Sequence, residues 1–178
     1  MLLGLLPPIG LEIPCATYAV NVPFKVDGLG IISLDFKGGW KHRVERNIGG
    51  GLGGVMLKNI GFEVSADDPV LGKVTFSQAD IDVTPLSRLE LIGQLPPTFR
   101  NLMFLDFTVT IEKPPGGGPP LRLANTNTAT VFNDNLTVYP PQGAVYQLKQ
   151  PVDLAPVGAP TKVVAQLLQY PVTVSHNP

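Results

Sequence analysis

Apolar and polar residues alternate with a period of two along much of this chain, and this is the pattern that most constrains its fold. In residues 102–112 the apolar side chains fall on every second position, with threonine or acidic residues at most positions between them. The apolar set is Met103, Leu105, Phe107, Val109 and Ile111. Successive side chains of a β-strand point to opposite faces, so this segment predicts a strand with one buried face.

Proline and glycine interrupt the whole chain, with nineteen of each among 178 residues. Proline removes a backbone donor and clashes with the preceding helical turn, so few windows can hold a long helix. The sequence EKPPGGGPP at residues 112–120 can only form a turn or loop, and alternation resumes after it. We therefore expect a long hairpin between residues 102–112 and 121–132, with Pro114–Pro120 as its loop.

Shorter segments with the same alternation predict further strands. These segments cover residues 17–26, 31–36, 40–48, 55–65, 70–76, 80–83, 88–91, 136–139 and 144–149. Roughly nine to eleven short strands between turn signals are typical of an all-β, antiparallel β-sandwich, here of a jelly-roll-like kind. A closed up-and-down barrel is the second choice. Residues 161–170 fit a helix or a C-terminal strand equally well.

The charge of the chain excludes several classes of function. Charged residues are only 15% of the chain and the formal net charge is −1, so no basic field exists to attract nucleic acid. A surface with few charges tends to associate, which favours a homo-oligomer.

The lone Cys15 excludes an intramolecular disulfide. No stretch approaches the ~20 apolar residues of a membrane span, and no signal peptide is recognisable, which slightly favours an intracellular location.

The first fourteen residues, MLLGLLPPIGLEIP, form an apolar arm that contains three prolines. The remainder, residues 15–178, is expected to be the β-sandwich domain. Because so apolar a segment is unfavourable in water, it packs either on its own domain or on a neighbouring subunit. The candidate contacts with a second subunit are Leu2, Leu3, Leu5, Leu6 and Ile9.

Residues 40–43 are the strongest candidate for a binding site. Trp40, Lys41, His42 and Arg43 place aromatic rings beside cations on one predicted strand, a combination that holds sugars, anions or protein partners. The simpler interpretation is an ordinary strand, with Trp40 in the core and the cations in water.

Acidic residues supply the candidate metal site. Asp67, Asp68, Asp80 and Asp82 offer the carboxylate oxygens that calcium prefers, with the first two in a predicted loop before Pro69. Like charges on a solvent-facing strand are equally common, so calcium is a minor expectation and no other cofactor is expected.

Signals for catalysis are weak. Glycines 49, 51 and 54 match G-x-G-x-x-G, but the residues after them alternate like a strand, whereas a dinucleotide site needs a helix there. The two histidines, His42 and His176, have no metal-site spacing, and no nucleophile motif is present. We expect the protein not to be an enzyme.

These features favour a non-catalytic structural protein, such as a coat, shell or appendage subunit that self-associates through its apolar arm. The alternative is a carbohydrate- or lipid-binding β-sandwich module, with or without calcium. That module would use Trp40 together with exposed aromatic residues such as Tyr139 or Tyr146.

Overall fold

The structure is a computed structural model that describes residues 6–49, 53–79 and 86–176. Within these residues it contains thirteen strands and no helix, which confirms the all-β class. The strands are β1 Glu12–Val26, β2 Gly30–Ile48, β3 Gly54–Asp68, β4 Gly72–Gln78, β5 Ser87–Gln94, β6 Pro97–Leu105, β7 Phe107–Ile111, β8 Leu121–Asn125, β9 Ala129–Leu136, β10 Gln142–Leu148, β11 Val152–Pro156, β12 Ala165–Leu167 and β13 Val172–His176.

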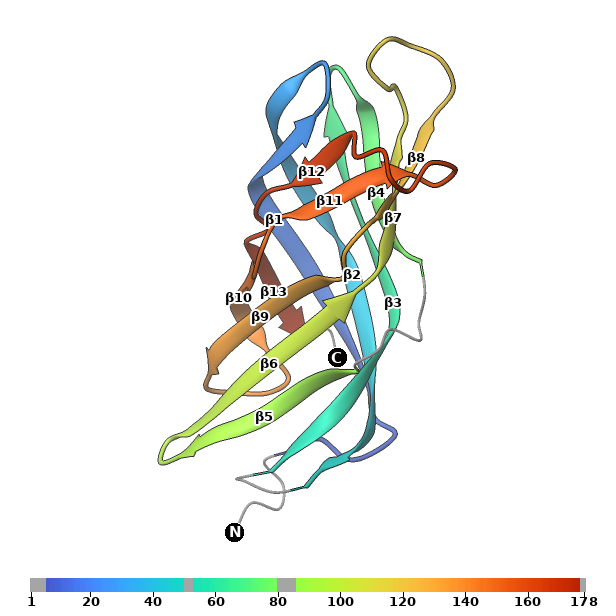
Figure 1. Cartoon of the computed structure of the whole chain (residues 1–178). Coiled ribbons are helices and arrows are strands. Elements are labelled where there is room, and N and C mark those ends of the chain that lie inside the picture. The colour runs from blue at the N-terminus through green and yellow to red at the C-terminus, as the bar shows by residue number, and fades with distance from the viewer. Residues whose placement is uncertain (1–5, 50–52, 80–85, 177–178) are drawn as a thin grey trace.

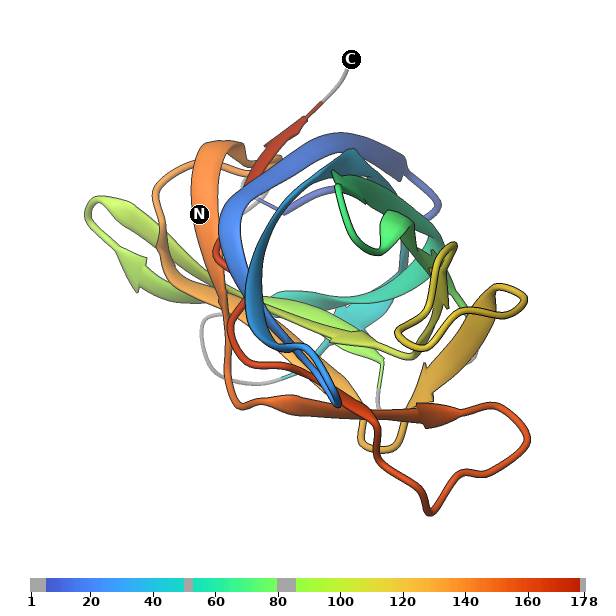
Figure 2. The ribbon, with the colours of Figure 1, turned by 90° about the horizontal axis from the view of Figure 1, so that it is seen from above.

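The strands form one antiparallel, hydrogen-bonded sheet that closes on itself at two places. Pairing of β3 with β5 closes a lower ring, made of β1, β2, β3, β5, β6, β9, β10 and β13. Pairing of β12 with β1 closes an upper ring, made of β1, β2, β3, β4, β7, β8, β11 and β12. Figure 1 shows the two rings one above the other, and Figure 2 shows β1 and β2 curving around the axis of the upper ring.

Three long strands, β1, β2 and β3, belong to both rings, and each is irregular where it passes from one ring to the other. β1 has a bulge between Ala19 and Val22, and the pairing of β2 with β3 shifts between Lys41 and His42. Bulges bend a strand and increase its twist. At Gly38 a Cβ atom would lie 2.0 Å from the carbonyl oxygen of Glu63, so only glycine allows the two backbones to approach this closely.

The strand expected at residues 102–112 has the predicted buried face but is divided in two. Met103, Leu105, Phe107, Val109 and Ile111 are all at most 3% exposed. The chain changes partners at position 106, where β6 pairs with β9 in the lower ring and β7 pairs with β8 in the upper ring. The expected hairpin loop between residues 111 and 121 is confirmed.

Side chains at this change of partners hold the two rings together. The amide oxygen of Asn125 accepts a hydrogen bond from the backbone N–H of Phe107 at 2.9 Å, and its Nδ2 donates to Asp106 at 2.9 Å. The hydroxyl of Thr128 also donates to Asp106, at 3.0 Å. The bond to Asn125 satisfies the backbone N–H of Phe107 where β7 begins, and the two bonds to Asp106 join the side chains around it.

Several elements differ from the sequence-based prediction. Residues 31–36 and 40–48 belong to one strand, β2, which continues through Gly38 and Gly39. Residues 161–170 contain the short strand β12 and no helix, and residues 137–139 lie outside any strand. The expected strand at residues 80–83 lies outside the described residues. Gly54 begins β3, so a strand follows the glycine-rich segment as expected.

The chain joins the sheet before residue 15, because β1 begins at Glu12 and Ile13 is fully buried. Just before β1, the N–H of Gly10 donates to Val44 at 2.8 Å and the carbonyl of Leu11 accepts from Val44 at 2.9 Å. The described part of the apolar segment is therefore fastened to its own sheet. In the described part of the chain, no helix is long and apolar enough to cross a membrane.

Candidate functional site

The upper end of the upper ring holds an apolar cavity of about 290 Å³. Its wall contains the ends of β1, β7, β8 and β11 and the start of β12, together with two prolines of the β7–β8 loop. The apolar lining residues are Val26, Ile111, Pro114, Pro115, Leu121, Leu123, Pro156, Val164 and Ala165. A concave, mostly apolar cavity at the open end of a closed sheet is a common place for a small-molecule site.

Two charged residues, Asp27 and Lys162, also line this cavity. The backbone N–H of Asp27 donates to Val164 at 2.9 Å, and the N–H of Val164 donates to Leu154 at 3.0 Å, so the rim is hydrogen-bonded across three segments. The two charges are opposite, which gives the cavity no net charge from its described lining residues. The lining of the cavity therefore suits a ligand with an apolar body and a neutral polar end.

The lower ring contains a hydrogen-bonded chain of three aromatic residues. The indole N–H of Trp40 donates to Nδ1 of His42 at 2.8 Å, and Nε2 of His42 lies 2.5 Å from the Tyr139 hydroxyl. Because indole can only donate, Nδ1 must be the acceptor, and the neutral imidazole carries its proton on Nε2. His42 thus donates to the oxygen of Tyr139.

Burial determines the protonation states of His42 and Cys15 in the core. Desolvation lowers the pKa of His42 to about 3, with repulsion from His176 as a smaller cause. Burial also raises the pKa of the Cys15 thiol to about 12. The neutral imidazole and the protonated thiol are both in the core, with exposures of 1% and 4%, so neither is placed to act as a catalytic base or nucleophile.

A second buried polar pair lies beside this chain. The hydroxyl of Tyr146 donates to Oδ1 of Asn101 at 2.5 Å, and Nδ2 of Asn101 donates to the carbonyl of Arg88 at 2.9 Å. Tyr146 also contacts Trp40 edge-on, with ring centroids 5.7 Å apart.

Tyr146→Phe is expected to lower the free energy of unfolding by about 1–3 kcal/mol, because it leaves Oδ1 of the fully buried Asn101 without its donor. Chemical denaturation measures this loss. The double variant Tyr146→Phe with Asn101→Leu should lose less than the two single variants added together, since it removes both partners. Strict additivity would show that the two side chains do not interact.

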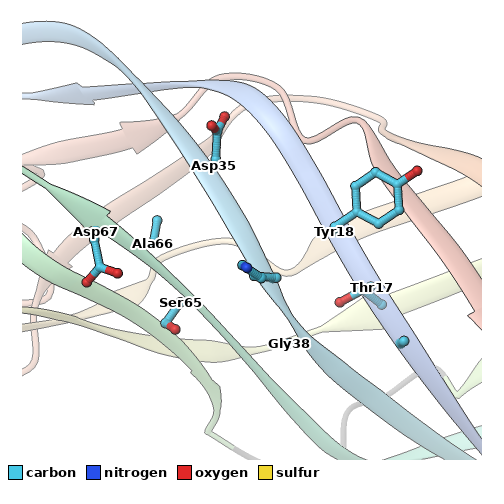
Figure 3. Close-up of a pocket in the computed structure, with 9 residues that line it drawn as sticks. Thr17, Tyr18, Asp35, Gly38, Ser65, Ala66 and Asp67 are labelled. Carbon is cyan, nitrogen blue, oxygen red and sulfur yellow. The ribbon is translucent and has the colours of Figure 1, made fainter.

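The outer face of β1, β2 and β3 carries a different, more open depression of about 620 Å³. Figure 3 shows its residues coming from the three strands, with Gly38 between Thr17 and Ser65. Its lining residues are Ala16, Thr17, Tyr18, Asp35, Lys37, Gly38, Ser65, Ala66 and Asp67.

The structure separates the four residues of the candidate binding site at positions 40–43. Trp40 and His42 are 3% and 1% exposed and lie in the core, whereas Lys41 and Arg43 point outward. Lys41 forms an ion pair with Glu12 at 2.8 Å, and Arg43 forms one with Glu45 at 2.8 Å. The four side chains therefore do not make one aromatic-basic surface, because alternation along β2 places them on opposite faces.

Of the four candidate metal ligands, the structure describes Asp67 and Asp68. Asp67 and Asp68 lie at the end of β3, not in a loop, and the carboxylate of Asp68 accepts from the backbone N–H groups of Val70 and Leu71, each at 2.9 Å. Asp80 and Asp82 lie outside the described residues. Among residues that the structure describes, no group of three or more histidine, cysteine or acidic side chains could hold a metal ion.

Of the candidate contacts with a second subunit, Leu2, Leu3 and Leu5 lie outside the described residues. Leu6 packs against the core of its own chain, and Ile9 is 58% exposed. A homo-oligomer stays a prediction.

Sequence reasoning did not identify the cavity at the upper end. The available signal was the proline- and glycine-rich loop directly after Ile111, the last inward-facing residue of its strand. The remaining lining residues come from four separate segments, and only the pairing of distant strands brings them together.

No family model and no curated protein matches this sequence. Among solved structures, the chain resembles DynF from the dynemicin biosynthesis pathway of Micromonospora chersina. The two chains are 19% identical, the match covers 96% of this chain and 82% of that chain, and the TM-score is 0.80. At this identity the likeness is one of fold.

This likeness overturns the expectation of a coat, shell or appendage subunit. DynF is a protein of a biosynthesis pathway and not an assembly protein, so the prediction of a coat, shell or appendage subunit is wrong. The low content of charged residues, which prompted that prediction, is equally compatible with a fold that encloses a large apolar core.

Proposed function

We propose that this protein is a non-catalytic binding module for an apolar, lipid-like small molecule, held at the upper end of the upper ring. The observation that carries the proposal is the cavity of about 290 Å³ with its predominantly apolar lining. That volume is near the lower end of the roughly 300–1,000 Å³ typical of small-molecule sites, which fits a medium-length aliphatic chain or one end of a larger molecule.

Burial of the ligand's apolar surface supplies the affinity in this proposal. Each methylene group removed from water contributes about 0.8 kcal/mol, so an eight- to ten-carbon chain gains several kcal/mol before the cost of its immobilisation. Asp27 and Lys162 carry opposite charges at the cavity, so a neutral alcohol is expected to bind at least as tightly as a carboxylate of the same length.

Absence of catalysis is part of the same proposal. The charged side chains among the described lining residues are Asp27 and Lys162, and neither is paired with a buried nucleophile or base there. Neither a cofactor nor calcium is needed for an apolar molecule to enter this cavity.

Leu121→Glu tests the proposal. Leu121 is half-buried on the wall of the cavity, so a carboxylate at this position should weaken binding of decanol by roughly tenfold or more, and of decanoate further. Displacement of the fluorescent probe aminoanthracene measures both affinities. Val145→Glu is the control, because Val145 lies on β10 in the lower ring and is 48% exposed. Equal loss in both variants, or no saturable binding by the wild-type protein, would contradict the proposal.

A further inference from the structure

Two side chains of opposite charge line the apolar cavity at the upper end of the upper ring. Asp27 follows β1, and Lys162 lies in the loop between β11 and β12. Neither side chain forms an ion pair or a hydrogen bond with another residue that the structure describes. Every other described residue of the lining is apolar. The described lining therefore offers a ligand one carboxylate and one ammonium, and no other polar side chain.

Backbone hydrogen bonds hold these two residues near each other on the rim. The N–H of Asp27 donates to the carbonyl oxygen of Val164 at 2.9 Å, and Val164 follows Lys162 by two residues. The N–H of Lys162 donates to the carbonyl oxygen of Ala159 at 3.0 Å. Because these bonds use backbone atoms alone, the carboxylate and the ammonium stay available to a ligand.

A third charge near Asp27, that of Lys25, lies outside the cavity. Lys25 is exposed and pairs across the strands with Gln166, whereas the next pair, Val26 and Ala165, is buried and lines the cavity. Successive side chains of a strand point to opposite faces, so Lys25 points away from the cavity. The described charges that face a bound ligand therefore sum to zero.

A ligand with a single charge does not suit this rim. An anion can pair with Lys162 but is repelled by the carboxylate of Asp27, and a cation meets the reverse arrangement. A neutral alcohol avoids repulsion but forms weaker hydrogen bonds, because charge-assisted bonds are roughly twice as strong as neutral ones. An amino-acid head group carries an ammonium and a carboxylate together, so it can donate to Asp27 and accept from Lys162 at once.

We propose that the preferred ligand of the apolar cavity is a zwitterionic amphiphile with an amino-acid head group, whose ammonium pairs with Asp27 and whose carboxylate pairs with Lys162. This inference rests on the proposed function, since the tail occupies the cavity of about 290 Å³. Burial of the tail supplies most of the affinity, and the two rim charges supply the specificity.

Four amphiphiles with the same octyl tail test the head group. 2-Aminodecanoic acid carries both charges at pH 7, octylamine the positive one, nonanoate the negative one and octanol neither. Displacement of aminoanthracene from the full chain at low ionic strength measures the four affinities. 2-Aminodecanoic acid should bind roughly fivefold tighter than octanol, and neither singly charged compound should bind tighter than octanol. Added salt should reduce the fivefold preference, because the rim charges are solvent-exposed.

Two rim variants assign the charges. Asp27→Asn and Lys162→Gln should each remove most of the preference for 2-aminodecanoic acid over octanol. Asp27→Asn should also tighten binding of nonanoate, and Lys162→Gln should tighten binding of octylamine, because each change removes the repelling group. Asp134→Asn and Lys149→Gln are the matched controls, because both residues are exposed, on β9 and directly after β10 in the lower ring, and they should keep the preference.

The outcomes separate this inference from the proposed function. Saturable binding of octanol without a preference for 2-aminodecanoic acid, or a preference that both rim variants retain, overturns the inference and leaves the proposed function intact. Equal weakening of all four compounds by the rim variants also overturns the inference, since it shows a role in shaping the cavity and not in selecting charge. Absence of saturable binding by any of the four compounds overturns both.

Discussion

Gly38→Ala is expected to lower the free energy of unfolding by roughly 3 kcal/mol or more. An added Cβ atom would lie 2.0 Å from the carbonyl oxygen of Glu63 and 2.7 Å from the Cα atom of Val64. Both obstacles are backbone atoms, which cannot rotate away as a side chain can. Relief would require β2 to move away from β3 at the point where both strands pass between the two rings.

Gly61→Ala is the matched control, because Gly61 lies on the facing strand and a Cβ atom there would meet only Cβ of Lys41, at 3.8 Å. This is ordinary van der Waals contact, so a change of less than about 1 kcal/mol is expected. Urea denaturation followed by circular dichroism gives both free energies. Similar values for the two variants would show that β2 and β3 are not in close contact at Gly38.

Acidification from pH 6.5 towards pH 3 is expected to destabilise the protein through His42. The ordinary histidine pKa of 6.5 applies to the unfolded chain, whereas burial lowers the pKa of His42 to about 3 in the fold. Between these values the unfolded chain binds a proton that the folded chain does not. Stability from this group is therefore complete above pH 6.5 and decreases by about 1.4 kcal/mol per pH unit below it, for a total on the order of 5 kcal/mol.

The diagnostic window is about pH 6.5 to 5, because Glu12 and Glu45 have pKa values lowered by their ion pairs and titrate below it. His42→Gln provides an acceptor and a donor but cannot titrate, so it should remove most of the slope in this window whatever its stability at pH 7. His176→Gln should keep most of the slope. If the free energy of unfolding of the wild-type protein does not change with pH in this window, or if both variants reduce its slope equally, the pH dependence does not come from His42.

The local pattern of the sequence predicted the strands and their faces well. The five apolar residues from Met103 to Ile111 share a buried face because alternation is a property of a single strand. The break at Asp106 was not predictable, because it depends on which distant strands pair on either side, β9 before it and β8 after it. The closure of the sheet into two rings depends on the same long-range pairing.

Prediction of sites succeeded less well, for a related reason. Alternation placed Trp40 and His42 on one face and Lys41 and Arg43 on the other, but which face is buried depends on the ring that β2 helps to close. Residue type alone suggested an aromatic-basic surface. The apolar cavity uses residue types that are common in any core, such as Leu121 and Val164, so nothing in their local sequence distinguishes them.

Methyl NMR of the protein during titration with decanol tests the central claim, that an apolar molecule binds at the upper end of the upper ring, most directly. We predict saturable shifts of the methyl groups of Ile111, Leu121, Leu123 and Val164, with those of Leu89 and Val145 in the lower ring unchanged. Saturable shifts confined to the lower ring, or no saturable shift of any methyl group, would contradict it.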